Sequence, residues 1–246
     1  MLYHSMLDSQ DVKNPPPFVY DQIVDDICSL AWNNLANHDI LQIAHAYYYF
    51  SIQFRENLTV ALQLFPRDPA LERLHQEECN TDNLSPWPEV AGVGEKLDHD
   101  EFMRRLLAFP SSKNDMHHII AAGDSYLTLS RNADPMTRAL SIVSYEDGGL
   151  TKIFSAILRA PDWSGKGQEA FRYFLEKHLL FDTDPDEGHG ALCRHLKPDD
   201  RIVPLWAGFQ ELLITSVPKL LGVSQRPGCR ASQKPARAAL TYRVGQ

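Results

Sequence analysis

The sequence contains 246 residues, with a formal net charge of −8 and a hydrophobic fraction of 43%. This length suits one large domain or two small ones, and the hydrophobic fraction is sufficient to form a core. The acidic balance argues against a broadly nucleic-acid-binding surface. Apolar runs stay short of the roughly 20 residues that span a bilayer, and the N-terminus lacks the pattern of a secretory signal. We therefore expect a cytoplasmic protein with neither a nucleic-acid nor a membrane partner.

The four cysteines are scattered along the chain and form no Cys-x-x-Cys pair; they are Cys28, Cys79, Cys193 and Cys229. A framework of disulfides needs regularly placed pairs, and a structural zinc site needs closely spaced thiolates. The cysteine pattern therefore predicts neither feature.

Apolar residues recur at helical spacing through most of the chain, and alternating strand patterns are absent. Proline and glycine mark the connections, and Asp39 is placed to cap the second helix. The predicted helices cover about 20–34, 39–66, 69–78, 98–109, 115–129, 135–158, 166–182 and 201–221. Helices with short connections predict an all-α bundle of about seven to eight helices.

The two ends of the chain differ in composition from the helical part. Residues 1–19 hold the Pro15-Pro16-Pro17 run and are predicted to be an N-terminal extension. Residues 223–246 contain basic residues but no acidic ones, and we expect a flexible basic tail there. The helical domain is predicted to span 20–222.

Several ionisable residues fall on the apolar faces of the predicted helices. Glu78 follows Leu71 and Leu74 on one face, and His99 lies a turn before Phe102. The inward-facing set is Glu78, His99, Glu146, His178 and Asp182. Unpaired burial of such groups costs several kcal/mol, so they need hydrogen-bond partners or a metal ion.

Carboxylates and imidazoles from several helices form a donor set that suits iron or manganese. A single inward Glu or His is more often a hydrogen-bonded core residue, and His45 is interpreted as packing or as a support for ligands. His117 and His118 follow a loop and are expected at the surface. Inward ionisable residues occur on four helices. A shared metal site explains this better than four separate buried polar residues, each with its own energetic cost.

On these residues the chain resembles the heme-oxygenase-like diiron oxidases and oxygenases, which share a fold with heme oxygenase, TenA-type thiaminases and the PQQ-synthesis oxidase. The resemblance covers roughly residues 20–221. It lies in Glu77-Glu78 followed by His99, in Tyr145-Glu146, and in His178-x3-Asp182 with a later His189-Gly190. It implies a heme-oxygenase-like bundle whose metal ligands are Glu78, His99, Glu146, His178, Asp182 and His189.

Two features leave alternatives open within this ligand set. A segment rich in proline and glycine separates Glu78 from His99, so Glu77 or Glu95 is an alternative early carboxylate. Six residues separate Asp182 from His189, so Asp186 is an alternative partner of that histidine.

The resemblance further implies that two iron ions (Fe2+, with manganese as the alternative) use O2 as a co-substrate. The substrate would be a small molecule such as an amino acid, an amine or a fatty acid, and an electron donor and a homodimer are compatible with the family. Tyr48, Tyr145 and Phe174 are predicted to wall the substrate pocket. Two other functions fit the same helices: a metal-independent TenA-like or PQQ-oxidase-like enzyme, and a non-catalytic helical interaction protein.

Overall fold

The structure, a computed structural model, describes residues 19–109, 116–182 and 188–222. Within these ranges the chain is helical and has no strand, which confirms the all-α prediction. The α-helices are α1 (Val19–Cys28), α2 (Asn37–Leu64), α3 (Pro69–Cys79), α4 (His99–Leu106), α5 (His117–Asn132), α6 (Pro135–Ser144), α7 (Leu150–Ile157), α8 (Lys166–Asp182), α9 (His189–Cys193) and α10 (Val203–Ser216). Short 3-10 helices form η1 (Trp32–Asn34), η3 (Asp200–Ile202) and η4 (Pro218–Leu221), and a π-helical turn forms η2 (Tyr145–Gly149).

The helix boundaries differ from the sequence expectation at several places, including the first helix, which ends at Cys28 rather than at residue 34. Helix α2 begins at Asn37, and Asp39 lies in its first turn, where its side chain accepts a hydrogen bond from the backbone N–H of Ala36 at 2.7 Å. The helix predicted over 135–158 is interrupted by η2, where Gly148 has φ 96°. The short helix α9 was not predicted at all. The boundaries therefore depend on local contacts that the hydrophobic pattern does not encode.

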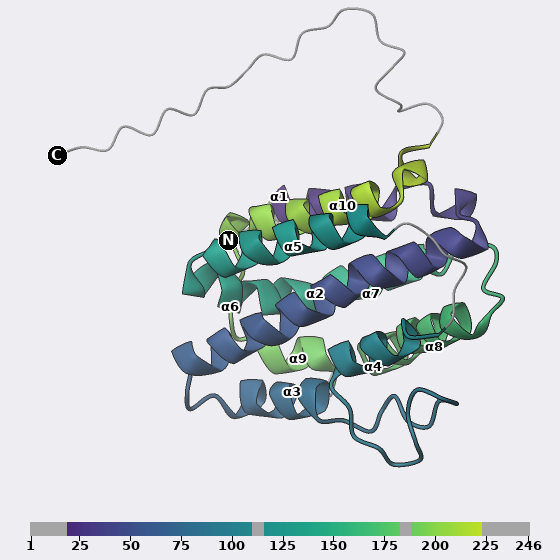
Figure 1. Cartoon of the computed structure of the whole chain (residues 1–246). Coiled ribbons are helices and arrows are strands. Elements are labelled where there is room, and N and C mark those ends of the chain that lie inside the picture. Colours follow the sequence, from purple (N-terminus) through teal and green to yellow (C-terminus); the bar gives the residue numbers. More distant parts are fainter. Residues whose placement is uncertain (1–18, 110–115, 183–187, 223–246) are drawn as a thin grey trace, which may run out of the picture.

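The helices pack in levels around the long central helix α2 (Figure 1). Helices α1, α5 and α10 lie on one side of α2, and α3, α4, α8 and α9 lie on the other. Helices α6 and α7 lie between these two sets and contact η2 at their junction. Residues distant in sequence are therefore brought together beside α2, where α9 contacts η2, α3 and α8, and α4 contacts α8.

The core beside α2 is rich in aromatic rings. Phe50 packs against Tyr145 and Phe209 with ring centroids 4.9 and 4.5 Å apart, and Tyr145 packs edge-on against Trp206 at 4.8 Å. Each of these rings is at most 1% exposed. Large buried rings contribute much of the apolar area that drives folding, so this cluster anchors α2 to α10 and η2.

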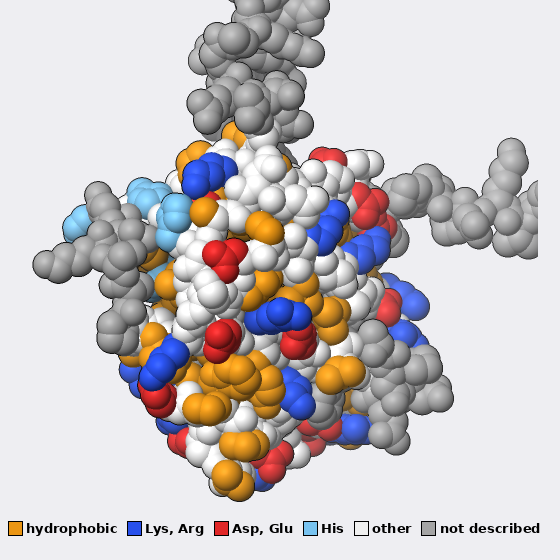
Figure 2. All heavy atoms as spheres, turned by 90° about the vertical axis from the view of Figure 1, so that its right-hand side faces the viewer, with side chains coloured by type: hydrophobic (Ala, Val, Ile, Leu, Met, Phe, Trp, Pro, Cys, Tyr) orange, Lys and Arg blue, Asp and Glu red, His pale blue; other side chains and the backbone are white. Residues whose placement is uncertain are grey.

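The surface carries both signs of charge. Acidic and basic side chains are interspersed with apolar ones on the face drawn in Figure 2. Among the described helices, none has an apolar stretch long enough to cross a membrane. The predicted N-terminal extension and C-terminal tail lie outside the described residues, apart from Val19.

Candidate metal centre

Helix α3 presents Glu78 to the interior. The helix starts with Asp68, whose carboxylate accepts hydrogen bonds from the backbone N–H groups of Ala70 and Leu71, and Pro69 takes the first helical position. Leu71, Leu74 and Glu78 then recur at helical spacing and are the buried residues of the helix. The apolar face that anchors α3 thus buries Glu78, whose side chain is only 6% exposed.

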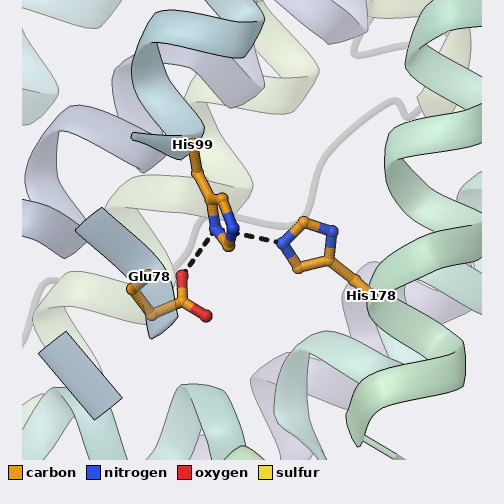
Figure 3. A group of neighbouring side chains, drawn as sticks. All are labelled: Glu78, His99 and His178. Carbon is orange, nitrogen blue, oxygen red and sulfur yellow. Dashed lines mark hydrogen bonds and ion pairs between the residues drawn. The ribbon is translucent and has the colours of Figure 1, made fainter. Parts of the chain in front are cut away.

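Two histidines from other helices point toward Glu78 (Figure 3). His99 is the first residue of α4, and its Nδ1 lies 2.6 Å from Oε2 of Glu78. His178 of α8 places Nε2 at 3.2 Å from the same Nδ1 of His99. Three donor atoms from three helices therefore converge on a small volume.

The orientation of His178 is determined by its own helix. Its Nδ1 lies 2.7 Å from the backbone carbonyl of Phe174 and donates a proton to it. Nε2 then carries a lone pair directed at His99. A histidine whose second ring nitrogen is held by a carbonyl is the usual arrangement of a metal ligand, because the bond sets the tautomer and the ring angle.

A second group forms on the other side of Glu78. His189, the first residue of α9, places Nδ1 at 2.8 Å from Oε1 of Glu78 and 3.4 Å from Oε2 of Glu146. His189 and Glu146 are 1% and 5% exposed. Glu78, Glu146 and His189 offer ligand atoms that lie within 4.8 Å of one another, as do Glu78, His99 and His178.

Two glycines allow the backbone segments that carry Glu146 and His189 to approach each other. Gly148 adopts φ 96° within η2, a conformation that favours glycine and breaks the helix directly after Glu146. A Cβ on Gly190 would lie 2.9 Å from the backbone oxygen of Glu146. The His189-Gly190 pair therefore lets α9 approach η2 closely enough for His189 to reach Glu146.

Glu78 belongs to both groups through different atoms. Its Oε2 faces His99 while its Oε1 faces His189. A carboxylate with its two oxygens directed at two donor groups could give one oxygen to each group if both held a metal ion.

The carboxylates titrate differently because their neighbours differ. Burial alone would raise the pKa of Glu78, but the adjacent His99 and His189 outweigh it and hold that pKa well below its usual value. Burial raises the pKa of Glu146, and the negative charge of Glu78 adds to this effect. Glu78 is therefore the more firmly ionised of the two.

The pKa values of His178 and His189 also differ. Burial, together with repulsion from His99, lowers the pKa of His178 to about 3. Burial would lower the pKa of His189 as well, but Glu78 and Glu146 outweigh it and raise that pKa to about 12. His178 is thus a neutral nitrogen donor, the form in which imidazole binds metals.

The donor atoms of the first group fit a metal ion better than they fit one another. Nδ1 of His99 faces both a carboxylate oxygen and the lone pair of His178, and one proton cannot satisfy both neighbours. Nε2 of His99 is buried and has no hydrogen-bond partner among the described residues. Such buried groups could hold a metal ion.

The structure brings five of the six expected ligands together, and Asp182 is the exception. Its backbone ends α8 one turn after His178. Its side chain lies outside the described part of the structure, and so does the alternative residue Asp186. Neither carboxylate is placed relative to the centre.

The alternative early carboxylates lie apart from the donor atoms that converge. Glu95 forms an ion pair with Arg105 at 2.8 Å and accepts a hydrogen bond from the backbone of Gly92. Glu77 lies 3.4 Å from Nε2 of His189, the nitrogen on the far side of that ring. Among the three candidates, Glu78 is the one that both groups share.

A small cavity of about 20 Å³ opens beside the two groups. This volume suffices for about one water molecule. Its lining includes Phe54 of α2, and side chains that the sequence analysis did not propose for a pocket: Tyr47, Ser51 and Arg55 of α2, with Cys79 and Asp100. Burial, followed by the charge of Glu78, raises the pKa of Cys79 to about 12, so its thiol stays protonated.

The helical spacing of α2 could have identified several of these lining residues. Tyr47, Ser51, Phe54 and Arg55 occur at intervals of four, seven and eight residues and therefore share one face.

The three residues expected to wall a substrate pocket take other positions. Phe174 packs against His178 with ring centroids 4.1 Å apart. Tyr145 lies in the aromatic core, where its hydroxyl accepts a hydrogen bond from Gln53. Tyr48 is partly exposed and packs edge-on against Tyr49. None of the three lines the described cavity, whereas Tyr47 does.

No family model matches this chain, and neither a curated protein nor a solved structure matches it significantly. The argument for a function therefore starts from the geometry of the centre.

Proposed function

We propose that this protein is a non-heme diiron oxidase or oxygenase of the heme-oxygenase-like type. The single observation that carries the proposal is the position of Glu78 between two donor groups, with one oxygen directed at each. Two nearby cations repel each other unless a negative charge lies between them, and a shared carboxylate supplies that charge.

The donor types favour a redox-active metal. Two histidines and one carboxylate form the first group, and this set is characteristic of non-heme iron centres that react with oxygen. One histidine and two carboxylates form the second group, which suits iron or manganese. The three described cysteines do not belong to either group, which distinguishes the centre from a thiolate zinc site.

When bound, two ferrous ions would supply the electrons that reduce O2. The chain would hold the ions through the residues of both groups and exclude water with the rings that surround them. Phe174 packs against both His99 and His178 and shields this side of the centre. Tyr47 and Phe54 line the small cavity beside the donor groups and would keep bulk water out of it while a C–H, C–C or N–H bond of a substrate is oxidised.

Iron loading under anaerobic conditions tests this proposal. We expect about two irons per chain, in keeping with dinuclear helical bundles, and consumption of O2 with a transient change in visible absorption when air is admitted. His178→Ala should lose at least one iron and the optical change. His118→Ala is the matched control, because His118 is exposed at the start of α5. Absence of iron from the wild-type protein, or identical behaviour of His178→Ala, would overturn the proposal.

A metal-independent enzyme is the second candidate function, and His189 supports it. This histidine lies between Glu78 and Glu146, whose carboxylates lie within 3.4 Å of its Nδ1 and hold the ring protonated. The three side chains together could pass a proton to or from a substrate. Once a substrate is known, activity that survives complete removal of metal by a chelator would favour this candidate, and loss of activity that iron restores would exclude it.

A further inference from the structure

Two ion pairs at the C-terminal end of the short helix α9 hold it to two neighbouring elements. Arg194 directly follows α9, and its Nε lies 3.2 Å from Oδ1 of Asp147 in η2. The next residue, His195, donates a hydrogen bond from Nε2 to Oδ2 of Asp68, the residue that caps the neighbouring helix α3 (Figure 1). We call the pairs Arg194–Asp147 and His195–Asp68 the α9 clasp.

The clasp connects α9 to the two elements that carry the carboxylates of the second donor group. Asp147 directly follows Glu146 in η2. Asp68 starts α3, whose last turn carries Glu78. His189 lies at the other end of α9, with its Nδ1 2.8 Å from Glu78 and 3.4 Å from Glu146. Each ion pair therefore ties α9 to one of the carboxylates that His189 contacts.

Both oxygens of Asp68 are used. Its Oδ1 accepts hydrogen bonds from two backbone N–H groups of the first turn of α3, and its Oδ2 accepts the one from His195. Burial would raise the pKa of Asp68, but the hydrogen bonds from the backbone of Leu71 and from His195 outweigh it and lower that pKa. One ionised carboxylate thus fixes both the start of α3 and the end of α9.

Helix α9 needs such contacts because it has only five residues. A helix of this length does not persist by itself, so its position depends on the contacts that it makes with other elements. The buried contacts of His189 with the two carboxylates would be replaced if these three side chains bound an ion instead of one another. The clasp uses none of their ligand atoms, so it can hold α9 in the same position in both states.

We propose that Arg194 and His195 are positioning residues for His189, which they hold where it can bind a metal ion together with Glu78 and Glu146. This inference rests on the proposed function, because it explains how one of the two metal positions is assembled. The side chains of Arg194 and His195 are 53% and 46% exposed. Exposed ion pairs contribute little to global stability, so the clasp should affect one metal position and leave the fold intact.

Anaerobic titration of the full-length protein with Fe(II), in competition with a chelator, tests the clasp. Arg194→Gln and His195→Gln should each weaken binding of one of the two irons about threefold, and the double variant about tenfold. The other iron should bind as in the wild type, because its ligands Glu78, His99 and His178 come from α3, α4 and α8. Arg194→Lys should keep most of the affinity, since it retains the charge that faces Asp147.

Asp68→Asn separates the clasp from the start of α3. Asparagine is as good a helix cap as aspartate, but it lacks the charge that faces His195. This variant should weaken the same iron as His195→Gln does, and combining the two changes should have no further effect. Additive losses in the combined variant, or loss of both irons from either folded single variant, would overturn the clasp.

Arg201→Gln is the matched control. Arg201 pairs with Asp199 at 2.8 Å and is 46% exposed, but its pair does not involve α3, η2 or α9. This variant should bind both irons as the wild type does. An equal effect of Arg201→Gln and Arg194→Gln would overturn the clasp.

Hydrogen exchange of the metal-free protein, followed by mass spectrometry, tests the clasp without iron. Amides of residues 188–196 should exchange at least about threefold faster in the double variant, while those of α5 keep their rates. Failure of the wild type to take up iron would contradict the diiron proposal, and the exchange rates would still decide whether the clasp holds α9. Two irons in the wild type, with unchanged iron affinity and exchange in the double variant, would contradict the clasp alone.

Discussion

Two groups of buried polar side chains lie on opposite sides of α2, and they differ in how their hydrogen-bonding atoms are satisfied. Around Gln53 and Asn57, donors and acceptors match. Gln53 donates to the hydroxyl of Tyr145 at 3.3 Å and accepts from that of Tyr126 at 3.1 Å. Asn57 donates to Ser141 and accepts from Ser130 and Arg138.

Around His99 the matching fails. Its Nδ1 faces both Glu78 and the lone pair of His178, and its Nε2 is buried with no hydrogen-bond partner among the described residues. A satisfied buried network stabilises and specifies a core, whereas an unsatisfied one marks a position that a ligand can complete. The comparison distinguishes structural polar residues from candidate functional ones, although both sets are buried.

The largest expected effect is on metal binding at Glu78. Glu78→Gln keeps the size of the side chain but removes the charge that faces both groups, so iron content should fall from about two per chain to about none. Elemental analysis of the purified variant measures this loss. Glu77→Gln is the control, since Glu77 is 27% exposed and lies on the far side of His189, and it should keep most of its iron. Equal loss in both variants would contradict the bridging role.

The next effect is stabilisation by metal. Metal that binds only the folded chain at about 100 times its dissociation constant stabilises it by about 2.7 kcal/mol, which raises Tm by about 5–10 °C at this chain length. Differential scanning calorimetry with Fe(II), and again with excess chelator, measures the shift. If neither Fe(II) nor the chelator changes Tm, the residues around Glu78 do not bind metal and are structural, like Gln53 and Asn57.

Replacing Asn57 should lower the free energy of unfolding by about as much as bound metal raises it, without changing the metal content. Asn57→Leu has a similar volume but leaves Arg138, Ser130 and Ser141 without their partner, which costs about 2–3 kcal/mol of the free energy of unfolding. Urea denaturation and elemental analysis of the same sample separate the two readouts. Loss of iron from a well-folded Asn57→Leu protein would show that the two networks are coupled.

The smallest effect concerns His45, which belongs to neither network. Burial lowers its pKa from 6.5 to about 4. The unfolded chain therefore binds more protons between these values, and the contribution to stability is complete above pH 6.5 and is lost as the pH falls toward 4. At pH 5.5 the loss is about 1 kcal/mol. His45→Gln should flatten the stability profile in this window, and an unchanged slope would contradict the assignment to His45.

Helical periodicity was sufficient to predict much of the fold and part of the centre. The apolar stripes predicted the faces of α3 and α8, so Glu78 and His178 were expected to point inward. The position of His189 came from the resemblance alone, because α9 is too short to show a period. The interruption at η2 was missed, since it depends on Gly148 and on the approach of Gly190.

The choice among alternative carboxylates also needed the structure. The path of residues 80–98 determines whether Glu78 or Glu95 meets His99, and no periodicity describes an irregular segment. Arg55 was missed for a different reason: a long charged side chain can cross from solvent to a cavity, so its residue type does not predict where its atoms lie.

The most direct test of the central claim is the anomalous scattering of iron in crystals of the iron-loaded protein. We predict two peaks on either side of Glu78, one next to His99 and His178 and the other next to Glu146 and His189. No peak at Glu78, or a single peak bound by one group with the other still closed by its own hydrogen bonds, would contradict a dinuclear centre bridged by this residue.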